Sequence, residues 1–272
     1  QMKHFAVIGD PIEHSMSPTM HKWIFDSLGM DAKYEKIKVG KNELPRIIHK
    51  MKSGDLDGIN ITIPLKEVVL TFLDEINERA KSIGAVNCIM ISNSNIIGNN
   101  TDWYGFSMAL KINNINLLDR EVVILGAGGS AKSILYALKR IGVQKIFLLN
   151  RTIENAKILE DNSIIAHSLD DAEEIIKTDS IIINSTSVGM QNKQSPINTN
   201  LINENQILFD IIYSPLETSL IQYGKKKGAL TVNGLDMFIY QGMASLDLWF
   251  GSSISTQVNF PKLKAYLESH LC

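Results

Sequence analysis

The sequence carries small residues at a spacing that suits the binding of a pyrophosphate. Gly126, Gly128 and Ala131 form the pattern G-x-G-x-x-A directly after the apolar run 122–125. That run fits a strand buried on both faces, and apolar residues then recur at helical spacing up to Gly142, which is placed to end a helix. In such a strand–turn–helix unit the glycines allow a tight turn and a close approach of the anion to the helix N-terminus. The stretch predicts a dinucleotide site, with an ordinary tight strand–helix connection as the alternative.

The end of the next apolar run favours NADP over NAD. Residues 145–150 are typical of a second strand, which ends in Asn150, Arg151 and Thr152. A carboxylate that would bind the ribose hydroxyls of NAD is absent from this end. The Arg151 guanidinium is able to pair with a 2′-phosphate, which a carboxylate would repel. A solvated arginine at a strand end is the alternative interpretation.

Polar side chains gather where the apolar strands of the first hundred residues end, which is where α/β proteins bind ligands. They are Ser15, Ser17, Asn60, Thr62, Lys66, Asn87, Asn99, Asn100, Thr101 and Asp102. A helix cap or a turn explains each of them taken singly. Together they predict a pocket rich in hydroxyl and amide groups, suited to a polyhydroxylated ligand.

An alternation of strands and helices has to position these residues. Strands are predicted at 4–8, 33–39, 57–63, 85–91, 95–98, 122–125, 145–150, 180–184, 206–210 and 229–233. Helices are predicted at 17–28, 42–52, 172–177, 217–226, 237–250 and 261–271, with helical signals up to residue 83 and a further helix from near residue 103. This rhythm is typical of α/β folds with a doubly wound sheet.

We therefore expect two domains. The first is an α/β substrate domain over residues 1–102, to which residues 237–272 return as C-terminal helices. The second is a Rossmann-like dinucleotide-binding domain over residues 103–236.

Composition narrows the class of protein. Of 272 residues, 44% are hydrophobic and 21% charged, as in globular proteins, and the formal net charge of −2 gives no basic face for nucleic acid. No apolar run reaches the length of a membrane span, and no metal site is expected. Two cysteines, Cys88 and Cys272, make no disulfide framework, so a cytoplasmic location is expected.

Nine motifs, in order along essentially the whole chain, resemble those of the shikimate dehydrogenase family. They are GDPIEHSMSPTMH from Gly9, NITIPLK from Asn60, GAVN from Gly84, GNNTDWYG from Gly98, GAGGSA from Gly126, NRT from Asn150, NSTSVGM from Asn184, DIIYSP from Asp210 and GLDMFIYQG from Gly234.

The resemblance implies roles for residues of both domains. The catalytic residues would be Lys66 and Asp102. The substrate would be bound by Ser15, Ser17, Asn60, Thr62, Lys66, Asn87, Asp102, Tyr213 and Gln241. NADP would be bound by Gly126, Ala127, Gly128, Gly129, Ser130, Ala131, Asn150, Arg151, Thr152, Thr186, Gly234 and Met237. Asn155 stands where many relatives carry a second basic residue, which implies a weaker phosphate clamp.

The implied activity is the NADP-dependent, reversible reduction of 3-dehydroshikimate to shikimate in chorismate biosynthesis, by a monomer or homodimer. A carbonyl that becomes an alkoxide needs a positive charge and a proton, which Lys66 would supply while Asp102 orients it. One alternative is a quinate/shikimate dehydrogenase with relaxed cofactor use, against which Ser15, Ser17 and Arg151 argue. The other is a catalytically silent NADP-binding sensor, against which the presence of both Lys66 and Asp102 argues.

Overall fold

The computed structural model describes residues 2–118 and 120–271, which divide into two compact units. Unit 1 combines the chain up to Gly105 with Ile239–His270, and unit 2 is built from Phe106–Phe238. The unit limits fall inside two helices, α4 (Asp102–Ile112) and α9 (Leu235–Phe250). The predicted return of the C-terminal helices to the first domain is confirmed.

Unit 1 contains a mixed six-stranded sheet in the order β2-β1-β3-β5-β6-β4. The strands are β1 (Lys3–Gly9), β2 (Ala32–Lys38), β3 (Gly58–Ile61), β4 (Glu75–Ile76), β5 (Cys88–Ser92) and β6 (Asn95–Asn99). β1 pairs in parallel with β2 and β3, whereas β5 is antiparallel to β3 and β6. A short hairpin joins β5 to β6, which explains why that pair is antiparallel, because two adjacent strands joined by a tight turn cannot run parallel.

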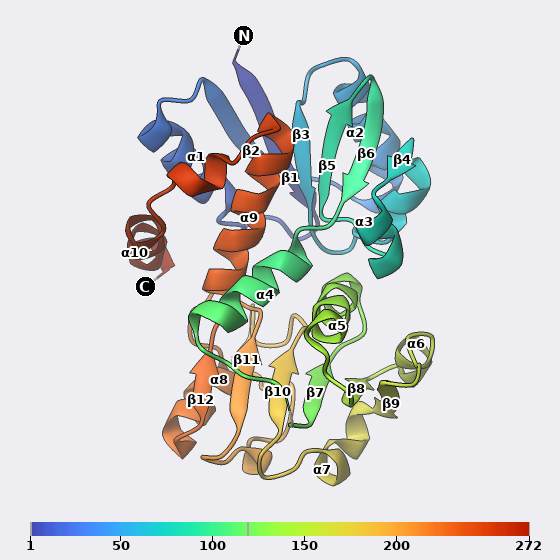
Figure 1. Cartoon of the computed structure of the whole chain (residues 1–272), viewed down its shortest axis with the longest axis vertical. Helices are drawn as coiled ribbons and strands as arrows, with labels where there is room; N and C mark the ends of the chain where they lie inside the picture. The colour runs from blue at the N-terminus through green and yellow to red at the C-terminus, as the bar shows by residue number, and fades with distance from the viewer. Residues whose placement is uncertain (1, 119, 272) are drawn as a thin grey trace. The chain divides into compact units, whose positions relative to one another are not determined.

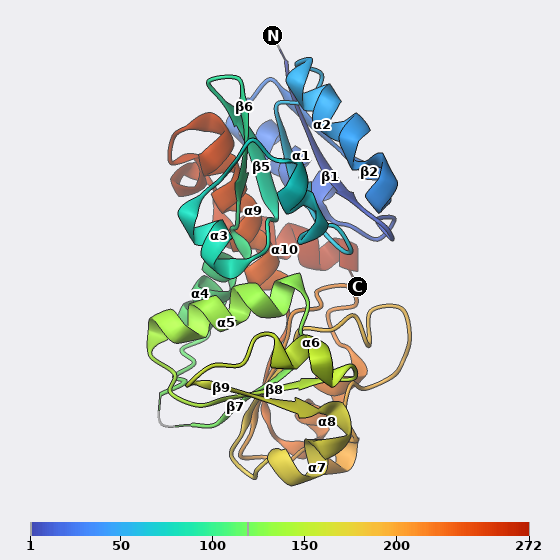
Figure 2. The same ribbon diagram turned by 90° about the vertical axis from the view of Figure 1, so that its right-hand side faces the viewer.

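Helices cover both faces of this sheet (Figures 1 and 2). Alternate residues of β1 point to opposite faces, so Ala6 and Ile8 join the core under α2 (Leu44–Lys52). On the other face Phe5 stacks on Trp249 of α9, with 4.6 Å between ring centroids. The remaining helical elements are α1 (Ser17–Leu28), η1 (Lys41–Glu43), η2 (Val68–Phe72), α3 (Glu78–Ile83), η5 (Ile254–Gln257) and α10 (Phe260–Leu271).

Unit 2 contains a fully parallel six-stranded sheet in the order β12-β11-β10-β7-β8-β9. The strands are β7 (Val122–Leu125), β8 (Ile146–Asn150), β9 (Ile164–Ser168), β10 (Ile181–Asn184), β11 (Ile207–Asp210) and β12 (Leu230–Val232). Numbered from β7, this is the 3-2-1-4-5-6 order of dinucleotide-binding folds, in which ligands bind where the order reverses. The reversal lies between β7 and β10, and the predicted Rossmann-like domain is confirmed.

The helices of unit 2 lie on both faces of its sheet, with α5 (Gly129–Ile141) on one side and α7 (Ala172–Ile175) and α8 (Ser219–Lys227) on the other (Figure 2). The core on the α7 and α8 side joins Val123 and Leu125 of β7 to Leu220 of α8. The other helical elements are α6 (Ile153–Lys157), η3 (Leu169–Asp171) and η4 (Thr199–Leu201). Among the described residues, no helix has the length and apolar character to cross a membrane.

Two edge strands of the structure are absent from the sequence prediction. β4 is only two residues long, too short for any alternation to show. β9 follows a polar turn and pairs on one side only, and its Ile165 remains 39% exposed. Edge strands bury less apolar surface than central ones, so their hydrophobic signal is weaker.

Candidate active site

Lys66 and Asp102 form a buried ion pair in unit 1. Lys66 follows β3, and its backbone oxygen accepts a hydrogen bond from the N–H of Val86 at 2.8 Å. Asp102 is the first residue of α4, and its Oδ2 lies 2.6 Å from the Lys66 Nζ. The two side chains are only 12% and 7% exposed, so solvent screens their attraction weakly. A buried ammonium beside a carboxylate is able to donate a proton while the carboxylate orients it.

Asn87 holds the second oxygen of the Asp102 carboxylate. Its Nδ2 lies 2.8 Å from Asp102 Oδ1, 2.9 Å from Thr101 Oγ1 and 3.2 Å from Gln241 Oε1, so two amide protons face three acceptors. Its Oδ1 accepts the backbone N–H of Thr101 at 2.6 Å. Asp102 also lies in the first turn of α4, where the helix dipole favours a negative charge. The carboxylate is therefore fixed in position.

The predicted serines and Thr62 lie at the carboxyl ends of β1 and β3. Ser17 opens α1 and is buried, and its backbone N–H donates to Ser15 Oγ at 3.3 Å. The backbone N–H of Thr62 donates to the Ile8 oxygen at 3.0 Å. The Thr62 methyl group packs so closely on Gly9 that a Cβ there would stand 2.5 Å from it. Gly9 thus allows the segment with the two serines to leave the sheet beside Thr62.

Sequence-predicted substrate residues thus fall into three sets. Lys66, Asn87, Asp102 and Gln241 are joined directly by hydrogen bonds, and Asn60 reaches them through the Asn87 carbonyl at 3.1 Å. Ser15, Ser17 and Thr62 lie at strand ends of the same unit. Tyr213 belongs to unit 2, where it stacks on Phe238 with 4.1 Å between ring centroids.

The glycine turn of unit 2 has room for a phosphate group. Gly126 adopts φ +101°, and a Cβ there would lie 2.9 Å from both Ser185 Oγ and Thr186 Cγ2. Gly128 is exposed and precedes α5, whose N-terminus has no side-chain cap, and no atom lies within 4 Å of a Cβ built on it. Open space before uncapped N–H groups fits an anion.

The other residues of the G-x-G-x-x-A stretch support this turn. Ala127 links the two glycines and is half-buried, and Gly129 and Ser130 open the first turn of α5. Ala131 is fully buried, which agrees with the close packing of helix and strand that the small residue permits.

The end of β8 presents Arg151 to solvent. The Asn150 Nδ2 donates to the backbone oxygen of Thr152 at 2.7 Å, which closes a tight turn around the arginine. Arg151 and Thr152 are both exposed, and within the described part of the chain no carboxylate pairs with the guanidinium. Such a turn fits the binding of a 2′-phosphate rather than a ribose diol.

A buried polar network fixes the loops after β10 and β11. Thr186 donates through its N–H and its hydroxyl to Asn184 Oδ1, at 3.1 and 2.7 Å. The Asn184 amide donates to Asp210 Oδ1 at 3.0 Å, and Thr218 Oγ1 donates to Asp210 Oδ2 at 2.7 Å. Burial raises the pKa of the Asp210 carboxyl to about 6, although these hydrogen bonds act in the opposite direction.

Gly234 and Met237 lie at the start of α9, within unit 2. A Cβ on Gly234 would stand 1.9 Å from the Ile211 carbonyl oxygen, so only glycine fits there. Met237 is 6% exposed. Gly234 thus packs directly against the segment that follows β11.

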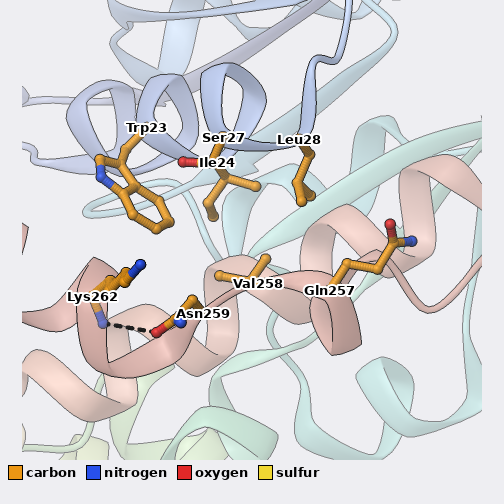
Figure 3. Close-up of a pocket in the computed structure, with 8 residues that line it drawn as sticks. All are labelled: Trp23, Ile24, Ser27, Leu28, Gln257, Val258, Asn259 and Lys262. Atoms are coloured by element: carbon orange, nitrogen blue, oxygen red, sulfur yellow. Dashed lines mark hydrogen bonds between the residues drawn. The ribbon is translucent and has the colours of Figure 1, made fainter.

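A cavity of about 420 Å³ in unit 1 is lined by none of these residues (Figure 3). Figure 3 shows its lining, which comes from α1 on one side and from η5 and the start of α10 on the other. The lining residues are Trp23, Ile24, Ser27, Leu28, Gln257, Val258, Asn259 and Lys262. None of them is a predicted site residue, and the lining contains no carboxylate to pair with Lys262. The buried Lys66–Asp102 pair is the stronger candidate for chemistry.

Sequence reasoning missed three side chains of the buried network, namely Tyr34, Thr101 as a partner of Asn87, and Ser245. Tyr34 lies in a strand of charged residues, where nothing marks it as functional. Ser245 lies four residues after Gln241 on α9 and donates to its backbone oxygen at 3.1 Å. A polar residue four positions after Gln241, on an otherwise apolar helix face, is the sequence feature that could have indicated Ser245.

Two family models match the chain. Residues 7–89 match the shikimate dehydrogenase substrate binding domain, and residues 107–213 match the shikimate / quinate 5-dehydrogenase domain.

Individual relatives match over nearly the full length. The shikimate dehydrogenase (NADP(+)) of Pyrococcus furiosus is 38% identical over 252 residues, which cover 92% of this chain and 91% of the relative. The crystal structure of shikimate 5-dehydrogenase from Thermus thermophilus in complex with NADP(H) and shikimate is 33% identical with a TM-score of 0.85, and covers 97% of this chain and 98% of its own. Quinate dehydrogenase from Corynebacterium glutamicum in complex with NAD is 26% identical with a TM-score of 0.86, and covers 98% and 99%.

Proposed function

Because the chain belongs to the shikimate dehydrogenase family, we propose that it catalyses the reversible reduction of 3-dehydroshikimate to shikimate with NADP as cofactor. The enzyme is an NADP-dependent oxidoreductase acting on a CH–OH group, in the biosynthesis of chorismate and the aromatic amino acids. The observation that carries the proposal is the buried Lys66–Asp102 pair at 2.6 Å.

The pair is suited to the proton transfer that the reaction needs. NADPH, when bound, supplies the hydride that reduces the substrate carbonyl. Lys66 places a positive charge and a proton at the carbonyl oxygen as it becomes an alkoxide, and takes the proton back in the reverse direction. Asp102 holds the Lys66 ammonium in place and accepts a hydrogen bond from a neighbouring substrate hydroxyl. Asn87 keeps the carboxylate aligned through its bond to Oδ1.

Hydroxyl and amide groups that the family resemblance indicates would bind the rest of the substrate. They bind the ground state and orient the ring, so that the reacting carbonyl lies at Lys66. We assign this role to Ser15, Ser17, Asn60, Thr62, Asn87, Gln241 and Tyr213.

The residues around the glycine turn of unit 2 would bind NADP. The uncapped N-terminus of α5, with Gly126 to Ala131, receives the pyrophosphate, and Asn150, Arg151 and Thr152 receive the adenosine phosphate. Thr186, Gly234 and Met237 are assigned to the nicotinamide side. The dense contacts at Gly126 and the open space at Gly128 support this assignment.

The rival function is a quinate/shikimate dehydrogenase with relaxed cofactor use. The quinate dehydrogenase relative makes it a specific alternative, while Ser15, Ser17 and the exposed Arg151 favour shikimate and NADP. The test measures turnover of shikimate and of quinate with NADP and with NAD, by the absorbance of the reduced nicotinamide. We expect turnover chiefly with shikimate and NADP. Comparable turnover of quinate with NAD would favour the rival, and no turnover with any pair would refute both.

The organisation of the whole protein is part of the proposal. We assign substrate binding to residues 1–102 with 237–272, and cofactor binding to residues 103–236. We further propose a cytoplasmic enzyme that acts as a monomer or homodimer and binds neither nucleic acid nor membrane.

A further inference from the structure

The hydroxyl group of Tyr34 in β2 donates to Asn60 Oδ1 in β3 at 2.8 Å. On its other side the Asn60 carboxamide donates through Nδ2 to the Asn87 carbonyl oxygen at 3.1 Å and to Ser245 Oγ at 2.8 Å. A backbone carbonyl only accepts hydrogen bonds, so the nitrogen of Asn60 has to face Asn87 and the oxygen has to face Tyr34. The Asn60 side chain is thus held in one orientation by three partners.

This arrangement limits what Asn60 offers to a substrate. Both amide protons are engaged, and one lone pair of Oδ1 already accepts from Tyr34. The single lone pair that remains would accept from a substrate hydroxyl and would repel a substrate carboxylate. Asn60 is only 5% exposed, which agrees with a side chain that orients its neighbours more than it binds ligand.

Hydrogen bonds continue from Asn60 to Lys66 without a break. Ser245 Oγ lies 3.3 Å from Thr101 Oγ1, and Thr101 Oγ1 accepts from Asn87 Nδ2 at 2.9 Å. Asn87 then binds Asp102, which pairs with Lys66. A buried network of this kind is rigid when every member is satisfied, and it loosens when one member is lost.

The ring of Tyr34 is itself held in place. It stacks on the imidazole of His21, with 4.0 Å between centroids and planes 11° apart. His21 is fully buried, and its Nδ1 lies 2.8 Å from the backbone oxygen of Ser17. The hydroxyl therefore has a fixed position from which to orient Asn60.

We propose that Tyr34 is a positioning residue of the substrate site, whose hydroxyl fixes the Asn60 carboxamide and, through it, the groups around Lys66 and Asp102. This inference rests on the proposed function. It adds a residue of β2 that the sequence motifs do not include. It also means that Asn60 links β3 to α9 through its hydrogen bond to Ser245. At most one lone pair of its Oδ1 is then left to accept a hydrogen bond from the substrate.

The test replaces the hydroxyl and keeps the ring. Tyr34→Phe preserves the stack on His21, and we expect kcat/KM for shikimate to fall about 5- to 20-fold, the usual effect of one lost hydrogen bond to a buried group. The KM for NADP should stay within about twofold of wild type, because the affected bonds all lie in unit 1. In an Asn60→Ala background, Tyr34→Phe should cause no further loss, since its effect passes through Asn60. Tyr266→Phe on α10 is the matched control and should behave as wild type.

Two outcomes would overturn the proposal: an unchanged kcat/KM in Tyr34→Phe, or the same loss with and without Asn60. A second readout does not depend on activity. The side-chain amide protons of Asn60, followed by NMR, should exchange with solvent faster in Tyr34→Phe than in wild type and in Tyr266→Phe. If wild-type protein failed to oxidise shikimate, the proposed function would fail, while the exchange experiment would still decide whether Tyr34 holds Asn60.

Discussion

At the scale of single residues, the kinetics of Lys66 variants distinguish a role of Lys66 in catalysis from a role in substrate binding. If Lys66 serves mainly as the proton donor at the transition state, Lys66→Ala should lower kcat by roughly 10²- to 10⁴-fold. The KM for shikimate should change far less, because the hydroxyl and amide groups that bind the ground state remain. Lys66→Arg should not restore activity, since a guanidinium does not give up a proton near neutral pH. Steady-state kinetics on folded variants measures both constants.

A large rise in KM with most of kcat retained would contradict this role and make Lys66 a binding residue. Lys22→Ala is a suitable control, because Lys22 pairs with Asp26 on the exposed side of α1. Its kinetics should match those of the wild type.

Arg151 is the residue on which cofactor choice is expected to depend. Arg151→Ala removes a charge-assisted contact worth roughly 1.5–3 kcal/mol, so the KM for NADP should rise about 10- to 150-fold. The KM for NAD should rise much less, because NAD lacks the 2′-phosphate. The comparison uses shikimate at saturation with each cofactor. Equal losses for both cofactors would show that Arg151 does not recognise the phosphate.

The sequence indicated the polar residues of the site better than it indicated the side chains that hold them in position. Lys66 and Asp102, 36 positions apart, belong to the polar cluster predicted at the ends of apolar strands, and the family resemblance implied their catalytic roles. Tyr34 was not recognised, because it lies between Lys33 and Glu35 in a strand whose charged residues indicate only an exposed edge. Its role depends on the register that places β2 next to β1 and near β3, which is a tertiary property.

At the scale of elements, the turn between β7 and α5 contains two glycines with different requirements. Gly126 adopts a positive φ and is enclosed by Ser185 and Thr186, whereas Gly128 has φ −88° and faces open space. Gly126→Ala should therefore destabilise the fold of unit 2. Gly128→Ala should leave the melting temperature nearly unchanged and still weaken NADP binding, because its methyl group would occupy the space meant for the pyrophosphate.

Thermal unfolding and calorimetric titration with NADP distinguish the two variants. Unimpaired NADP binding by a stably folded Gly128→Ala protein would contradict the assignment of this turn to the pyrophosphate. The pair forms its own control, since the same substitution is made two residues apart.

The helices and strands also show where the periodicity of apolar residues is sufficient to predict an element. The central strands β7, β10 and β11 are almost completely buried apolar runs, and each was predicted within one residue of its bounds. β4 and β9 lie at sheet edges and were missed, because short or half-exposed strands carry no clear alternation. The strand order of each sheet was not predicted, since pairing between distant strands leaves no local pattern in the sequence.

At the scale of the whole molecule, the buried groups His21 in unit 1 and Asp210 in unit 2 have pKa values that burial shifts in opposite directions. In unit 1 burial lowers the pKa of His21 from 6.5 to about 4, because the charged imidazolium is disfavoured. In unit 2 burial raises the pKa of Asp210 from 3.8 to about 6, because the carboxylate is disfavoured. Both units therefore favour the neutral form of their buried group, with opposite consequences for stability as pH changes.

The signs follow from linkage. His21 contributes stability that is present above pH 6.5 and is lost as pH falls toward 4. Asp210 contributes stability that is present below pH 3.8 and is lost as pH rises through 6. Each of these pKa shifts of roughly 2 units corresponds to at most about 3 kcal/mol in the free energy of unfolding. Acidification from pH 6.5 to 4.5 should thus destabilise unit 1 and stabilise unit 2, and the two effects partly cancel in the overall unfolding curve.

Hydrogen exchange resolved by peptide, and corrected for the intrinsic rate at each pH, measures the two units separately. Between pH 6.5 and 4.5 we expect peptides of unit 1 to lose protection and those of unit 2 to gain it. His21→Gln should remove the pH dependence of unit 1 alone, and Asp210→Asn that of unit 2 alone. His270→Gln, at an exposed position of α10, should change neither. If both units of the wild type shifted in the same direction, or if neither variant altered its own unit, burial of these two groups would not be what makes stability depend on pH.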